Sequence, residues 1–103
     1  MKISVIIPCY KVEAHIEEVI LNLPEIVTYI IAVNDCSPDN TETILLDLQK
    51  RNPKIIYLKN EKNMGVGGAM ITGYRKSLEL GCDISIKMDG DGQMDSRYLP
   101  VLK

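Results

Sequence analysis

The chain has 103 residues, a length that suits one domain or part of one. A hydrophobic fraction of 46% and a charged fraction of 25% are those of a globular protein and exclude a disordered or collagen-like chain. The net charge of −2, with no block of like charges, gives no reason to expect nucleic acid as a partner. No apolar run is long enough to span a bilayer, so we expect no membrane segment in these residues and a cytoplasmic location.

The three cysteines are spaced far apart, without a CxxC pair. This spacing argues against a disulfide framework or a zinc site. We therefore expect Cys9, Cys36 and Cys82 to be free thiols that behave as small buried hydrophobic residues.

Strand-like and helix-like segments alternate along the chain. Strands carry short β-branched apolar runs, whereas helices carry apolar residues at helical spacing and end near Pro24, Pro53 and Gly81. The expected strands are 3–7, 27–33, 54–59 and 84–88, and the expected helices are 13–22, 41–51 and 65–80, with a further helix from Ser96.

This alternation predicts an α/β fold, a Rossmann-like parallel sheet with helices on both faces. Near-continuous apolar strands suit a sheet that is covered on both sides. Such sheets bind ligands outside the carboxyl ends of their strands. The loops expected at those ends are 8–13, 34–40, 60–68 and 89–95, and all four contain carboxylates.

Two carboxylates, Asp89 and Asp91, leave the fourth expected strand with one residue between them. Alternate residues of an extended chain point to the same side, so both could face one ion. Mg²⁺ is typically held by one or two carboxylates together with substrate phosphates. The alternative is a solvated turn. A calcium-binding EF-hand loop is excluded, because its sixth and twelfth positions would hold Met94 and Pro100.

Polar residues in the other loops have two interpretations each. Asp35 could accept a hydrogen bond from a nucleobase, or it could form a turn or cap the next helix. The glycines from Gly65 could open a helix N-terminus to an anionic ligand, or they could allow tight helix–sheet packing. A dinucleotide-binding GxGxxG loop is not formed, because Met70 stands where its last glycine is required. Glu13 could bind a ribose or base, or it could favour the helix dipole.

Four stretches occur in the order seen in one known family. Together they make the sequence similar to the beginning of family 2 glycosyltransferases with the GT-A fold, and especially to the dolichol- and polyprenol-phosphate sugar synthase branch. The stretches are IPCYKVE at 7–13, VNDCSPDNT at 33–41, NMGVGGAMITGYRKSLELG at 63–81 and KMDGDGQMD at 87–95. Three residues depart from the usual pattern: Lys11 stands where Asn is usual, Cys36 where Gly is common, and Pro38 follows Ser37.

The resemblance implies roles for the matching positions. The nucleotide contacts that it implies are Pro8, Tyr10, Glu13, Asp35, Gly65 and Asp89. It implies Asp91 as the main ligand of Mg²⁺ or Mn²⁺, with Asp89 beside it. The implied reaction is metal-dependent, inverting transfer of a sugar from a UDP- or GDP-linked donor to an acceptor such as a polyprenyl phosphate or a glycan.

Family members continue well past the DxD motif, which is Asp89-Gly90-Asp91 in this chain. Their acceptor site and catalytic base lie in that continuation. We therefore expect residues 1–103 to be the donor-binding part of a glycosyltransferase domain, to contain no catalytic base and to be inactive alone. The whole protein is expected to be an enzyme, at the cytoplasmic face of a membrane. Self-association through an open sheet edge is a further expectation. The alternatives are a nucleotidylyltransferase and a non-catalytic nucleotide-binding module.

Overall fold

The computed structural model describes residues 1–90, in which strands and helices alternate as expected. The elements are β1 (Ile3–Cys9), α1 (Ile16–Leu21), β2 (Tyr29–Asn34), α2 (Thr41–Arg51), β3 (Ile55–Lys59), α3 (Gly65–Glu79) and β4 (Ile84–Lys87). The helix expected from Ser96 lies outside the described residues.

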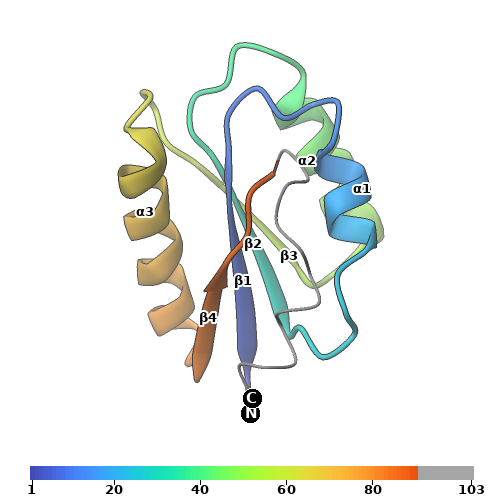
Figure 1. Cartoon of the computed structure of the whole chain (residues 1–103), viewed down its shortest axis with the longest axis vertical. Helices are drawn as coiled ribbons and strands as arrows, with labels where there is room; N and C mark the ends of the chain where they lie inside the picture. Colours follow the sequence, from blue (N-terminus) through green and yellow to red (C-terminus); the bar gives the residue numbers. More distant parts are fainter. Residues whose placement is uncertain (91–103) are drawn as a thin grey trace.

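The strands form one parallel sheet in the order β3-β2-β1-β4 (Figure 1). On β1, Val5 lies opposite Ile30 of β2 on one side and Ile86 of β4 on the other. Because all strands run in the same direction, their carboxyl ends and the loops that follow them meet at one edge of the sheet. This edge is at the top of Figure 1.

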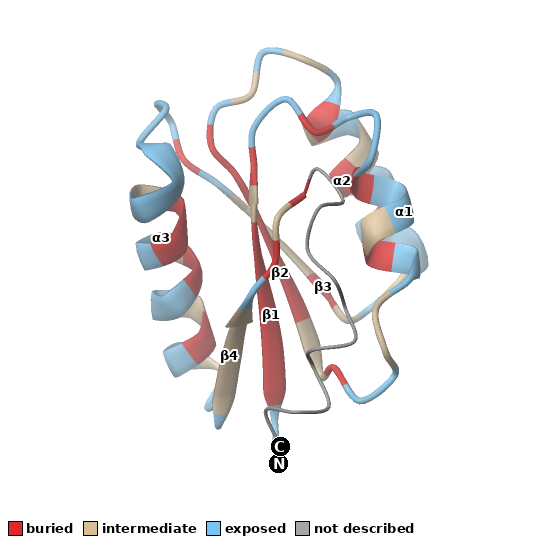
Figure 2. Cartoon of the chain, in the orientation of Figure 1, coloured by how far each residue is buried: buried red, intermediate tan, exposed pale blue. Residues whose placement is uncertain are grey.

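Helices cover both faces of the sheet, which confirms the expected fold class. Successive residues of β1 point to opposite faces. Val5 and Ile7 join a core cluster with residues of α1 and α2, whereas Ile6 joins a second cluster with Ala69 and Met70 of α3. In Figure 2 the buried residues accordingly run along β1 and β2 and along the sheet-facing side of α3, whereas β4 is at most half-buried.

The backbone of α3 lies unusually close to β1. A Cβ atom added to Gly73 would come within 2.3 Å of Cγ2 of Ile6, so no larger residue fits there without movement. One helical turn further on, the hydroxyl of Ser77 lies 2.8 Å from that of Ser4. Ser4 also donates a hydrogen bond to Ser85 of β4 at 3.0 Å, so these buried or half-buried hydroxyls join α3 to two strands.

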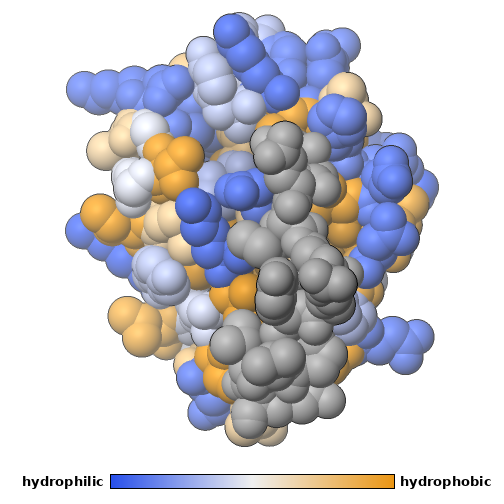
Figure 3. All heavy atoms as spheres, in the orientation of Figure 1, coloured by the Kyte–Doolittle hydropathy of each residue, from blue (hydrophilic) through white to orange (hydrophobic). Residues whose placement is uncertain are grey.

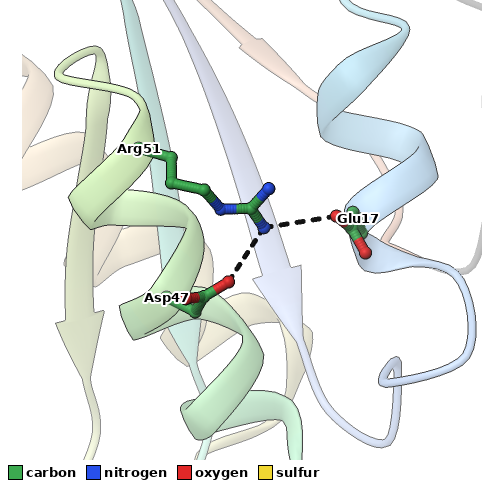
Figure 4. Close-up of polar contacts among 3 residues, drawn as sticks. All are labelled: Glu17, Asp47 and Arg51. Carbon is green, nitrogen blue, oxygen red and sulfur yellow. Dashed lines mark hydrogen bonds and ion pairs between the residues drawn. The ribbon is translucent and has the colours of Figure 1, made fainter.

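The first helix begins later than expected, at Ile16 rather than at position 13. The carbonyl of Val12 accepts hydrogen bonds from both His15 and Ile16, which makes a turn before the helix proper. On the surface, Arg51 of α2 forms ion pairs with Asp47 of the same helix at 2.8 Å and with Glu17 of α1 at 3.3 Å (Figure 4). All three side chains are more than half exposed, so this contact adds little stability.

The outer side of α3 carries apolar residues that face solvent. Figure 3 shows apolar patches on this side of the molecule. The exposed residues on and just before the helix are Met64, Val66, Ile71, Tyr74 and Leu78. No helix within residues 1–90 combines the length and the apolar composition that a membrane span requires.

Candidate functional site

A cleft of about 490 Å³ opens at the carboxyl edge of the sheet. Residues from the loops after β1, β2, β3 and β4 and from the first turn of α3 surround it. The lining residues are Pro8, Cys9, Tyr10, Lys11, Val12, Asp35, Asn63, Gly65, Val66, Asp89 and Gly90. The cleft therefore lies where an α/β sheet is expected to bind its ligand.

Five of the six residues that the sequence suggested as nucleotide contacts meet in this cleft: Pro8, Tyr10, Asp35, Gly65 and Asp89. They are up to 81 positions apart in the chain (89 − 8) and come together only because parallel strands end at the same edge. The cleft offers a ligand one aromatic ring, two carboxylates and the open start of a helix.

Asp35 is a buried carboxylate, 3% exposed, at the end of β2. Its Oδ1 accepts hydrogen bonds from the side-chain amide of Asn60 and from the backbone N–H of Met64, each at 2.9 Å. Thr72 of α3 in turn donates to the amide oxygen of Asn60 at 2.9 Å. Asp35 therefore holds the loop between β3 and α3 in place. It does not cap α2, which was one of the roles considered from the sequence.

Asp39, and not Asp35, serves the start of α2. Its Oδ1 accepts from the backbone N–H and the hydroxyl of Thr41, at 3.1 and 2.6 Å, and from the hydroxyl of Ser37. Burial favours the neutral form of Asp39, but the hydrogen bonds from Ser37, Thr41 and Glu13 outweigh it and lower the pKa of this carboxyl. The carboxylate is therefore ionised at the positive end of the helix, where negative charge is favoured.

Glu13 does not line the cleft. Its Oε2 accepts a hydrogen bond from the backbone N–H of Asn40 at 3.2 Å, and its own N–H points to Asp39 at 3.4 Å. Glu13 therefore joins the loop after β1 to the loop after β2, and the structure does not bring it together with the other five residues.

The same two loops contain the non-glycine residues of the range 1–90 that have left-handed backbone. Lys11 has a φ of 55° and Cys36 a φ of 59°. The N–H of Lys11 donates to the hydroxyl of Ser37 at 2.8 Å, and Ser37 in turn donates from its backbone to Oδ1 of Asn34 at 2.9 Å. Both loops are thus held against each other at the cleft wall in a conformation that side chains disfavour.

Asp89 presents its carboxylate to the cleft, with 45% of the side chain exposed and the ammonium of Lys87 at 3.9 Å. Gly90 beside it is buried, and a Cβ there would lie 3.2 Å from Val12 and 3.3 Å from Ile7. Its lack of a side chain lets the chain turn over the apolar core. Asp91 lies outside the described residues, and residues 1–90 contain no group of three or more potential metal ligands.

The cysteines are only partly as expected. Cys9 is buried, and this burial, with the nearby negative charge of Asp39, raises the pKa of its thiol to about 12. It is thus a neutral hydrophobic residue in the cleft wall and no nucleophile. Cys82 is partly buried, but Cys36 is exposed, which corrects the prediction of three buried thiols. Cys36 directly follows Asp35 in the loop after β2.

Several cleft residues were not among the predicted contacts, notably Lys11, Asn63 and Val66. The only sequence signal at Lys11 was its departure from the usual family residue. Asn63 and Val66 lie within two residues of Gly65, so the glycine-rich segment could have suggested them.

The sequence model of one protein family, glycosyl transferase family 2, matches residues 4–102. The chain belongs to this family. The match spans the elements that form the sheet and cleft, as the resemblance of the four sequence stretches led us to expect.

Two curated relatives of this glycosyl transferase family 2 chain have a polyprenyl phosphate in their names. The chain is 42% identical to the UDP-N-acetylglucosamine–dolichyl-phosphate N-acetylglucosaminyltransferase of Methanococcus voltae, over 88% of this chain and 41% of that protein. It is 34% identical to the undecaprenyl-phosphate mannosyltransferase of Micrococcus luteus, over 99% of this chain and 43% of that protein. The chain thus spans less than half the length of these relatives.

A solved structure has the same fold. The crystal structure of S. aureus TarS 1-349 in complex with UDP aligns with 99% of this chain and with 31% of its own chain, at a TM-score of 0.75 and 23% identity. This likeness supports the fold assignment for the family member described here, an N-terminal GT-A sheet.

Proposed function

We propose that this chain forms the donor-binding part of a glycosyltransferase that transfers a sugar from a nucleoside-diphosphate sugar to a polyprenyl phosphate. The observation that carries the proposal is the meeting of Pro8, Tyr10, Asp35, Gly65 and Asp89 in one cleft at the carboxyl edge of the sheet. The acceptor class rests on the names of the two curated relatives. Donor binding is proposed for this chain, and transfer for the whole protein.

Different residues of the cleft would bind the base and the diphosphate of the donor. Tyr10, 42% exposed, offers a ring face on which a base can stack. Asp35 is rigidly held by Asn60 and Met64, so it can accept from a base without reorganising. The first turn of α3 contains no acidic residue that would repel a diphosphate, and the positive end of the helix dipole favours an anion there.

Asp89 is the described residue suited to Mg²⁺ or Mn²⁺, since its half-exposed carboxylate faces the cleft and hard cations prefer oxygen ligands. We propose Asp91, which lies outside the described residues, as the main ligand, with Asp89 beside it. When bound, the ion would neutralise the charge that develops on the leaving diphosphate. Transfer by direct displacement would invert the configuration of the sugar.

Thermal unfolding tests the proposal. The whole protein is melted with UDP, GDP, CDP or dTDP, each with and without Mg²⁺ or Mn²⁺. A nucleotide at ~100 times its dissociation constant adds about 2.7 kcal/mol to stability, which corresponds to a rise in Tm of several degrees. We expect a metal-dependent rise with UDP or GDP.

Two variants locate the binding site. Asp89→Asn should lose the metal-dependent part of the rise, whereas Asp47→Asn, which removes the same charge from the exposed side of α2, should keep it. A folded wild type that no nucleotide stabilises would refute donor binding. Stabilisation without transfer to a polyprenyl phosphate would favour the non-catalytic binding module.

A further inference from the structure

Lys11 is a cleft residue whose charge has no partner in the described part of the fold. No carboxylate of residues 1–90 lies within ion-pair distance of its ammonium. The Nζ atom instead lies 5.5 Å from the centre of the Tyr10 ring, in the same cleft. An exposed cation–π contact of this kind is weak, so the ammonium is available to a ligand.

The backbone of Lys11 is held in a left-handed conformation that lysine adopts less readily than asparagine or glycine. Its φ is 55°, and the hydrogen bond to Ser37 keeps it there. Asparagine and glycine adopt such a backbone more readily than lysine. A lysine at this position is thus not explained by the fold.

The charges of the cleft lining also point to Lys11, because a diphosphate is an anion and needs a positive group to bind. Among its described lining residues, Asp35 and Asp89 are acidic and Lys11 alone is basic. In the sheet β1 lies between β2 and β4, so Lys11 leaves the sheet between Asp35 and Asp89. A nucleoside diphosphate that reaches from Asp35 to Asp89 would lie across the loop after β1, which carries Lys11.

We infer that Lys11 binds the diphosphate of the donor and contributes to the affinity of this cleft for nucleoside diphosphates over nucleosides. The ammonium of lysine is a mobile point charge on a long stem, and it can leave the Tyr10 ring to meet a phosphate oxygen. The inference rests on the proposed function and adds to it a binding residue.

Isothermal titration of the whole protein tests this role. The ligands are the nucleoside diphosphate that gives the largest rise in Tm, its monophosphate and its nucleoside. Lys11→Asn removes the charge and keeps a side chain that tolerates the backbone. We expect it to weaken diphosphate binding roughly tenfold, the effect of one charge-assisted hydrogen bond, and to change nucleoside binding less than about twofold.

Lys50→Asn is the matched control, because it removes one positive charge from the exposed surface of α2 and should leave all three affinities unchanged. Equal losses for diphosphate and nucleoside in Lys11→Asn would place the contact elsewhere and overturn the inference, as would no loss. If the wild type binds the nucleotide, these results concern Lys11 alone. If the wild type binds none, the proposed function fails and this role with it.

Discussion

At the scale of single residues, two positions show what the backbone requires at the cleft. Lys11 and Cys36 both have left-handed backbone, at φ 55° and 59°. The family resemblance places Asn and Gly at these positions, and those residues adopt positive φ most readily. The usual residues thus match the shape of the turn, and the two departures change local strain and surface chemistry without changing the fold.

This strain predicts the effect of Cys36→Gly. The left-handed backbone costs a side chain about 1–2 kcal/mol, and glycine gives back about 0.5–1 kcal/mol through its freedom in the unfolded chain. Because Cys36 is exposed, little packing is lost, and we expect a net gain of about 0.5–1 kcal/mol in the free energy of unfolding, measured in urea. Cys36→Ala removes the thiol and keeps the strain, so it should gain nothing. Equal gains in both variants would assign the effect to the thiol.

At the scale of elements, α3 serves the core and the cleft at once. Its middle packs on β1 through Gly73, and its first turn lines the cleft through Gly65 and Val66. The Asp35–Asn60–Thr72 hydrogen bonds then tie the end of β2 to the same helix. The position of the helix N-terminus in the site therefore depends on how closely the helix packs further along.

Two glycines of α3 predict opposite effects of the same substitution. Gly73→Ala would place a methyl group against Ile6, and overpacking of this kind costs about 1–3 kcal/mol. Gly67 has nothing within 4 Å of its added Cβ, so Gly67→Ala should gain up to about 1 kcal/mol from helix propensity alone. Chemical denaturation of both variants measures the difference. No loss in Gly73→Ala would contradict the close packing of α3 on β1, and a loss in Gly67→Ala would contradict the open space around Gly67.

At the scale of the whole molecule, the sheet has β3 and β4 at its ends. Within residues 1–90, β4 pairs with β1 on one side only, and its residues Ile84, Ser85 and Ile86 are half-buried. An edge strand of this kind offers free backbone groups to another chain. The exposed apolar residues of α3 add apolar surface that another chain could cover.

We therefore propose that the 103-residue chain, prepared alone, self-associates. Light scattering over a concentration series should show a mean mass that rises above that of the monomer, 11.6 kDa, in the high micromolar range. A single monomeric species over the whole series would contradict this expectation.

The amino-acid sequence by itself determined the order and type of the elements, the parallel α/β class and the family. Each of these depends on short-range patterns: β-branched runs make strands, helical spacing makes amphipathic helices, and prolines and glycines end them. The predicted start of α1 was three residues too early. A turn at Val12 precedes the helix, and polar residues are common both in such turns and in the first turn of a helix.

Only the tertiary structure decided which loop residues meet. The strand order β3-β2-β1-β4 placed Lys11 between Asp35 and Asp89, and it left Glu13 outside the cleft with Asn40. It also made Asp35 an anchor for the loop before α3, which no local pattern indicates. The physical reason is that these hydrogen bonds join residues 25 to 29 positions apart, and they form only because the sheet brings their loops together. The sequence of one loop does not show which other loop will lie beside it.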